Sequence, residues 1–259
     1  MAFASASSRL AGLMIWVICL GLHAENPSSG DTGNFRAYAE AGFRKAQGRY
    51  ASSPRDVEAA WQFARASFDL ADLATNRTER TAVAERGIAA AREAVALKPN
   101  VAAAHYYLGM TLAQLAQTKT LGALKLVPQM EHEFSLAREL DEHFDYAGPD
   151  RNLGLLYRDA PSIGSIGSRT KARQHLRRAV ELAAQYPENG LNLLEACLKW
   201  GDRNEARSEL KALEDVWLIA RTNFAGAAWA ASWADWEARL KKVKSAPVLK
   251  ARPTPRSKP

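Results

Sequence analysis

The residues best equipped for chemistry gather in one stretch of the chain, FDYAGPDRNLGLLYRDAPSIGSIGSRTKARQHL, between positions 144 and 176. Guanidinium, carboxylate, amide and phenol groups lie close together there, and glycines stand at 164 and 167. Such a set could bind an anion, a peptide or another polar ligand. The candidate binding residues are Tyr146, Asp150, Arg151, Asn152, Tyr157, Arg158, Ser162 and Ser165.

The glycine-containing segment from Ser162 to Ser168 invites comparison with a phosphate-binding loop. Such a loop needs backbone N–H groups converging at a helix start, usually after a strand. A helix is expected here after Ser168, which suits an N-cap, but no strand precedes the segment. The glycine spacing also matches neither nucleotide-binding fingerprint. The segment therefore indicates a turn between helices more than a phosphate site.

Metal binding and catalysis find little support in the residue spacing. His132 lies between Glu131 and Glu133, and Glu139 and His143 fall near the same helical face. A metal site needs three or four convergent ligands, and no spacing here indicates that convergence. The chain also has no HExxH or CxxC motif and no recognisable arrangement of nucleophile, base and orienting residue. We expect no enzyme activity, no metal and no cofactor.

The N-terminal segment resembles a secretory signal peptide. Arg9 precedes an apolar run from Leu10 to Leu22, and Ala24 supplies a small residue for cleavage. The run is short for a membrane span, although a retained anchor is the alternative. Cys19 lacks the small preceding residue of a lipoprotein signal. We expect residues 1–24 to be a signal peptide, residues 25–33 a linker, and the protein to be periplasmic or secreted.

The positive charge of the chain belongs mainly to its C-terminal end. The whole chain carries a formal charge of +7, and loss of Arg9 with the signal would leave 7 − 1 = +6. The last nineteen residues hold seven cations and no acid, which leaves the remainder near −1. This distribution argues against a nucleic-acid-binding body. Residues 244–259, interrupted by prolines, are expected to be a disordered basic tail.

The elements that position these groups form helical repeats. Alanine and leucine are abundant between Gly33 and Lys244, and β-branched runs are scarce, so residues 34–243 are predicted to be all-α. Segments KARQHLRRAV and NEARSELKAL align at an offset of 34, from Ala172 to Ala206. That offset, with Leu-Gly at 108–109 and 153–154, resembles the tetratricopeptide (TPR) family. The resemblance implies a solenoid of helical hairpins.

About four hairpins and capping helices follow from this alignment. The hairpins are expected over residues 56–97, 101–141, 149–184 and 188–213. A helix over 34–50 would precede them, and one or two tryptophan-rich helices over 214–243 would follow. Trp229, Trp233 and Trp236 recur on one helical face, which favours a cap packed on the last repeat, with a lipid or aromatic-ligand surface as the alternative.

Unequal spacing within the repeats predicts long turns. Leu193 to Ala206 is 13 residues, the family value, whereas Leu153 to Ala172 is 19, so six residues are inserted in the third repeat. The same count gives nine extra residues in the second repeat and ten in the first. Within-repeat turns of a solenoid share one edge, so these insertions predict an irregular rim where binding would occur.

For the candidate residues, structural and functional interpretations both stand. Tyr157 is the packing aromatic of its repeat, and Arg158 could simply close its helix. Arg151 and Asn152 fit either a polar binding site or internal structure. Asp150 could cap the helix that begins there.

The third repeat also resembles the T component of tripartite ATP-independent periplasmic (TRAP) transporter systems. The resemblance lies in its Gly-Pro, Leu-Gly, Tyr and Ala-Arg elements. That resemblance implies an exported helical protein working beside a ligand-binding subunit. Two functions stay open. The first is a non-enzymatic scaffold that binds a protein or peptide in its groove or rim. The second is a small-molecule or lipid accessory with an apolar cavity that includes TKTLGALKLVP.

Overall fold

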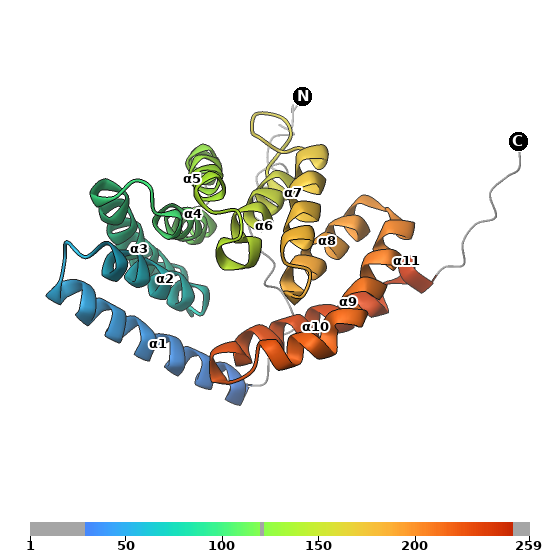
Figure 1. Cartoon of the computed structure of the whole chain (residues 1–259), viewed down its shortest axis with the longest axis horizontal. Coiled ribbons are helices and arrows are strands. Elements are labelled where there is room, and N and C mark those ends of the chain that lie inside the picture. Colours follow the sequence, from blue (N-terminus) through green and yellow to red (C-terminus); the bar gives the residue numbers. More distant parts are fainter. Residues whose placement is uncertain (1–28, 120–121, 251–259) are drawn as a thin grey trace, which may run out of the picture.

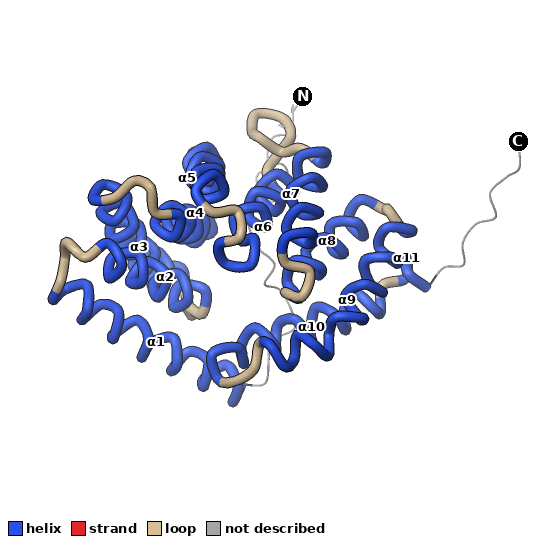
Figure 2. Tube along the Cα trace, viewed as in Figure 1, coloured by secondary structure: helices blue, strands red, loops and turns tan. Residues whose placement is uncertain are grey.

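The computed structural model describes residues 29–119 and 122–250. Every regular element in these ranges is helical, and the helices are joined by loops (Figure 2). The main helices are α1 (Ser29–Ser52), α2 (Val57–Asp72), α3 (Arg77–Leu97), α4 (Ala102–Gln117), α5 (Val127–Leu140), α6 (Phe144–Asp159), α7 (Arg169–Leu182), α8 (Pro187–Trp200), α9 (Arg203–Asn223) and α10 (Ala230–Ser245). Short helical segments are η1 (Ala123–Lys125), η2 (Ala227–Trp229) and α11 (Pro247–Lys250).

Four helical hairpins follow one another along an arc, which confirms the predicted all-α, TPR-like solenoid (Figure 1). They pair α2 with α3, α4 with α5, α6 with α7, and α8 with α9. Helix α1 packs on α2 at one end, and α10 packs on α8 at the other. Asp56, Asn76 and Ser168 start their helices by accepting hydrogen bonds from the first turn.

Close helix crossings explain the glycines of the repeat pattern. A Cβ atom on Gly109 would lie 2.6 Å from the Phe134 ring, and one on Gly154 would lie 2.7 Å from Leu176. Both distances are too short for a carbon atom. Glycine at these two positions therefore lets the helices of the second and third hairpins approach, as the motif predicts.

The core is divided into neighbouring clusters along the solenoid. The largest lies in the second and third hairpins and includes Tyr106, Phe134 and Leu153. Another joins the fourth hairpin to the C-terminal cap and includes Leu191 and Trp236. Each repeat therefore buries its apolar face against the next, as expected for a solenoid.

The tryptophan-rich segment packs as a cap. Trp233 and Trp236 are buried against the fourth hairpin, and Trp229 is partly buried beside them. The Trp233 indole N–H donates to the carbonyl of Phe224 at 2.6 Å. The first of the two interpretations of this stripe, a helix packed on the last repeat, is confirmed.

Several predicted boundaries differ from the observed ones. Helix α9 continues to Asn223 instead of ending near Leu213. Helix α6 spans Phe144–Asp159, but its residues 145–147 have left-handed backbone angles, so the regular helix begins close to the predicted Pro149. Helix α1 begins at Ser29, inside the predicted linker, and α11 lies inside the predicted tail. The predicted signal peptide and the last nine residues of the tail lie outside the described residues.

Two of the three predicted long turns are present. The turn of the second hairpin spans residues 118–126 and contains η1, and that of the third spans residues 160–168. The prediction for the first hairpin is wrong, because its turn spans only residues 73–76. The additional residues lie mainly in α3, an alanine-rich helix of 21 residues that Asn76 caps. The rim is therefore formed by two long turns.

Candidate functional site: the inner surface

The first helices of the hairpins share one side of the solenoid. Helix α2 packs on α4, α4 on α6, and α6 on α8. The Asp145 carboxylate, on α6, acts electrostatically on Arg65 and Asp69 of α2, and Glu188 of α8 acts on Asp72 and on Asp235 of α10. We call the surface that these groups face the inner surface. It comprises Arg65, Asp69, Asp72, Asp145, Tyr146, Glu188, Glu195, Asp235 and Arg239.

The inner surface is built around an unusual start of α6. Asp145, Tyr146 and Ala147 adopt left-handed backbone angles, with φ of 50°, 56° and 61°. None is glycine, so each carries the steric cost of that conformation, about 1–2 kcal/mol per residue. Three such residues in succession persist only where surrounding contacts hold them in place.

Arg151 supplies many of those contacts. Its guanidinium donates to the carbonyl oxygens of Asp145 at 3.1 Å and Tyr146 at 3.2 Å, and to the Asp145 carboxylate at 2.7 Å. It also donates to Asn189 Oδ1 at 3.2 Å and lies over the Tyr186 ring, 5.1 Å from its centroid. The side chain is only 6% exposed, so this charge is neutralised and hydrogen-bonded inside the protein.

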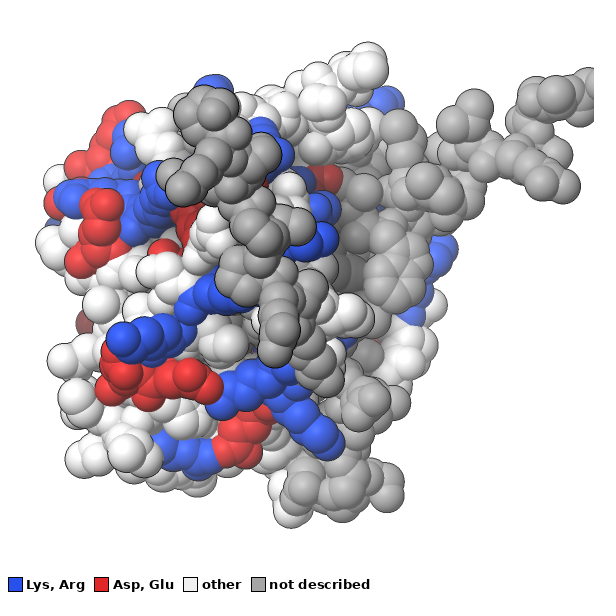
Figure 3. All heavy atoms as spheres, turned by 90° about the vertical axis from the view of Figure 1, so that its right-hand side faces the viewer, with Lys and Arg blue, Asp and Glu red and all other residues white. Residues whose placement is uncertain are grey.

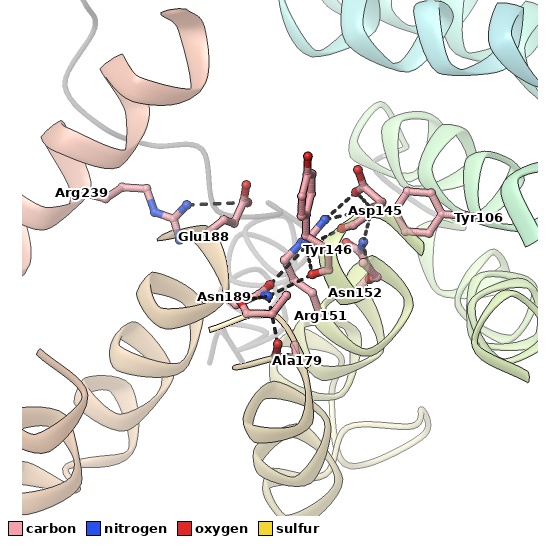
Figure 4. A network of polar contacts seen from close by, with 11 residues as sticks. Tyr106, Asp145, Tyr146, Arg151, Asn152, Ala179, Glu188, Asn189 and Arg239 are labelled. Carbon is pink, nitrogen blue, oxygen red and sulfur yellow. Dashed lines mark hydrogen bonds and ion pairs between the residues drawn. The ribbon is translucent and has the colours of Figure 1, made fainter. Parts of the chain in front are cut away.

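Tyr106 of α4 ties the second hairpin to the same turn (Figure 4). Its hydroxyl donates to Asp145 Oδ2 at 2.6 Å and accepts from Arg151 at 3.1 Å and from Asn152 at 3.0 Å. Burial, together with the charge of Asp145, raises the pKa of Tyr106 well above its usual range. The phenol therefore stays neutral and keeps its donor role.

Asn189 of α8 links the turn to the fourth hairpin. Its amide donates to the carbonyl oxygens of Tyr146 at 2.9 Å and Ala179 at 3.0 Å (Figure 4). The residue is 1% exposed. Three hairpins thus meet at one hydrogen-bonded polar network, which fixes the position of Tyr146 on the inner surface.

A second network fixes α10 against α8. The Arg239 guanidinium, 3% exposed, lies 2.9 Å from Glu195, 3.1 Å from Asp235 and 3.8 Å from Glu188. It also donates to Asn192 Oδ1 at 2.5 Å. Burial raises the pKa of Asp235 to about 6, an effect that Arg239 opposes and Glu188 adds to. The cluster therefore holds more acid than its one cation can neutralise.

On α2 the inner surface is more open. Arg65 and Asp69 form a loose pair at 4.0 Å, and their side chains are 59% and 50% exposed. Desolvation nonetheless raises the pKa of the Asp69 carboxyl to about 6, an effect that Arg65 opposes and that Asp72 and Asp145 add to. Asp72 lies one turn further along and accepts from Gln114 at 3.0 Å. These side chains are the accessible polar groups at this end of the surface.

The candidate residues predicted from the sequence lie in three places: the interior, the inner surface and the exposed rim. Arg151 and Asn152 belong to the buried network, so the structural interpretation holds for both. Tyr146 is 41% exposed and stacks on Tyr186 at a ring distance of 4.6 Å. It is the one candidate that lies on the inner surface with a substantial exposed area.

Asp150 does not cap its helix. Its Oδ1 atom lies 2.6 Å from His175 Nδ1 of α7, and the residue is 1% exposed. Tyr157 packs in the core, as its repeat position predicts, and donates to Glu131 at 2.5 Å. Arg158 pairs with its neighbour Asp159 at 2.6 Å. These residues stabilise the third hairpin and its contact with α5 of the second hairpin.

Ser162 and Ser165 lie in the long turn 160–168. The base of this turn is closed by hydrogen bonds from Gly167 N to Pro161 O at 3.0 Å and from Ser168 N to Tyr157 O at 2.9 Å. Ser162 is exposed and Ser165 is half-buried. Ile163, between them, is 89% exposed, so the tip of this turn projects from the rim.

Sequence reasoning missed Asp145, Asn189 and Arg239. Asp145 and Asn189 have no distinguishing local pattern, because their role depends on contacts between residues far apart in the chain. A signal for Arg239 existed in its spacing of four residues from Asp235 on the tryptophan-rich helix, which indicates an ion pair.

Outside the inner surface, several charged side chains pair across neighbouring helices. Cationic and anionic side chains alternate on the face that looks to the right in Figure 1 (Figure 3). Arg177 and Glu205, for example, pair across α7 and α9 at 2.5 Å. Over residues 29–119 and 122–250, no helix has the length and hydropathy to cross a membrane, and no three potential ligands converge as a metal site would require.

Comparisons with known proteins agree with this architecture. The model of the family described as regulator of microtubule dynamics protein 1-3 matches residues 32–143, less than half of the chain. A search of curated proteins finds no match. A crystal structure of a thermophilic TPR protein in Thermus thermophilus is similar over 74% of this chain and 97% of that chain, with a TM-score of 0.56 and 19% sequence identity. This chain therefore has the fold of a TPR-like helical solenoid.

Proposed function

We propose that this protein is a non-enzymatic scaffold that binds a polypeptide segment of a partner on its inner surface, with the long turn at 160–168 as a secondary contact. The main support for the proposal is that the inner surface combines a rigid backbone with exposed side chains. Buried networks fix the backbone of the inner surface, while Arg65, Asp69 and Tyr146 stay substantially exposed on it.

Preformed side chains favour binding of this kind. The helices that hold them are packed in a continuous solenoid, so mainly the partner loses conformational freedom on binding. The similarity to a TPR protein supports a role in protein interaction. It also supports a non-enzymatic role, since proteins of this fold are typically not enzymes. The matched family is described as a regulator of microtubule dynamics, and it covers only the first part of the chain.

A pull-down with two matched double variants tests the proposal. Arg65→Ala/Asp69→Ala removes an exposed pair on the inner surface, and Arg178→Ala/Glu181→Ala removes a similarly exposed pair on α7. We expect the first variant to lose partner capture and the second to retain it, with melting temperatures close to that of the parent. Equal capture by both variants would refute binding at the inner surface.

The alternative, a small-molecule or lipid accessory like the T component of TRAP systems, receives no separate support. Val127 and Leu126, from the segment expected to line a cavity, pack against the main core cluster. Native mass spectrometry of protein purified from its own host would detect a bound solute if this alternative holds. Apo protein with a co-purifying polypeptide would exclude it.

Export is a further part of the proposal. Arg9, the apolar run that follows it and Ala24 support cleavage of a signal peptide. N-terminal sequencing of protein recovered from the periplasm or the medium should begin at Glu25. Recovery of uncleaved chain from the membrane fraction would instead show a retained anchor.

A further inference from the structure

The inner surface carries more negative charge than its own cations neutralise. Arg239 lies within 4 Å of three carboxylates, those of Glu195, Asp235 and Glu188. One cation against three acids leaves two negative charges in this contact set. Across the surface, the direct partner of Asp72 is the neutral amide of Gln114, with Arg80 offsetting part of its charge.

This local excess runs against the charge of the whole chain. The chain carries +7, yet the groups that meet at α8 and α10 are predominantly acidic. At Asp202, by contrast, one acid contacts two arginines, Arg169 and Arg173. An uncompensated acidic region in a basic protein favours a cationic ligand, because acids facing one another repel until a cation arrives.

A second observation at the same place indicates a missing hydrogen-bond acceptor. Asn192 is fully buried, and its Oδ1 accepts from Arg239 at 2.5 Å. Its Nδ2 has no acceptor within the part of the chain that the structure describes. Buried donors normally find a partner, and a peptide carbonyl is one that a bound chain would supply.

An exposed aromatic ring lies between the acids. Figure 4 shows Tyr146 projecting between Glu188 on one side and Asp145 on the other. Its ring is supported by stacking on Tyr186 and by an edge contact with Phe224 at 5.2 Å. A tyrosine face binds the ammonium or guanidinium group of a ligand and also packs on its aliphatic stem.

We propose that the polypeptide segment recognised by the inner surface is an extended peptide bearing lysine or arginine side chains. Its cations contact Glu188 and Asp72, their stems pack on Tyr146, and its main chain provides the acceptor for Asn192. This inference rests on the proposed function and adds the chemistry of the partner. The residues Lys250 to Pro259, KARPTPRSKP, carry the same kinds of side chain, so competition by this segment is one outcome of the test.

Fluorescence anisotropy with designed peptides tests the charge requirement on the full chain. The probes are labelled decapeptides of equal length and apolar content with net charges of +4, 0 and −4. We expect the +4 peptide to bind and its affinity to fall roughly tenfold between low and moderate salt, because salt screens exposed charges. Equal or stronger binding of the neutral or acidic peptide would overturn the inference.

Isosteric variants locate the charge that matters. Glu188→Gln and Asp72→Asn should each weaken the +4 peptide by roughly three- to fivefold. The control Glu181→Gln, on α7 and 65% exposed, should leave the affinity unchanged. Circular dichroism melting establishes that each variant is folded. Unchanged affinity in folded Glu188→Gln and Asp72→Asn would overturn the inference.

The outcomes separate this inference from the function on which it rests. Charge-independent peptide binding that Tyr146→Ala abolishes would refute the cationic partner and leave the scaffold standing. Absence of binding for every peptide, with partner capture unaffected by Arg65→Ala/Asp69→Ala, would refute both. Tighter binding of the +4 peptide after the four cations of residues 250–259 are replaced by glutamine would support a cationic occupant and identify the tail as its competitor.

Discussion

Replacing Arg151 with methionine tests whether the buried network holds the left-handed turn. The substitution keeps much of the side-chain volume but removes the donors to two main-chain carbonyls, to Asn189 and to the Asp145 carboxylate. Removing one partner of a buried ion pair costs about 3–5 kcal/mol, since the remaining charge stays buried without compensation. Asp145 is 29% exposed at its side chain, so the lower half of that range is expected.

Urea unfolding of the variant measures this loss. Linear extrapolation gives the free energy of unfolding, and an unchanged slope would show that the same surface is exposed. Arg158→Met is the matched control, because Asp159 keeps Lys199 at 2.9 Å as a partner. We expect the control to lose about 1 kcal/mol, the value of an ordinary hydrogen-bonded contact. A loss below about 1 kcal/mol for Arg151→Met would refute the network as the support of the turn.

Four further substitutions test packing and charge. Gly154→Ala should destabilise the protein by about 1–3 kcal/mol, because the added Cβ meets Leu176. The control Gly42→Ala, in open space on α1, should stabilise it by about 0.5–1 kcal/mol. Equal thermal shifts for the two variants would contradict this reasoning. Gly167→Ala places a Cβ 2.1 Å from Ala160 O and should open the turn, which faster proteolysis near Ile163 would report and unchanged proteolysis would contradict. The raised pKa of Asp235, about 6 against 3.8, means that the folded state keeps a proton that the unfolded state releases, so stability falls as pH rises from about 4 to 6. Asp235→Asn should remove that fall and be more stable than the parent at pH 7.5, by at most roughly 3 kcal/mol; a variant less stable at pH 7.5 would contradict the assignment.

The repeat architecture could be predicted from the sequence because its signals are local and periodic. Leu153-Gly154 and Leu108-Gly109 stand where two helices cross closely, and their spacing from the second helices predicted the hairpins. The insertion in the third repeat was predicted correctly for the same reason. The first turn was not, because a count of residues cannot distinguish a longer loop from a longer helix, and here α3 is long, from Arg77 to Leu97.

The candidate site could be predicted only in part. The polar stretch from 144 to 176 does contain the left-handed turn and Arg151. No local pattern, however, indicates that the Arg151 side chain points into the protein. That orientation depends on Tyr106 and Asn189, which lie 45 and 38 residues away in the chain. Contacts of this kind arise when hairpins stack, so they depend on residues that are distant in the sequence.

Site-specific photo-crosslinking at Asp69 tests the central claim most directly. A photoreactive residue at this position lies on the inner surface with half of its side chain exposed, and the same residue at Glu181 lies on α7 as the control. Irradiation in the presence of the natural partner, followed by mass spectrometry, identifies the adduct. Binding at the inner surface predicts a polypeptide adduct at position 69 and none at position 181. An adduct at position 181 alone, or at neither position while the partner is bound, would contradict it.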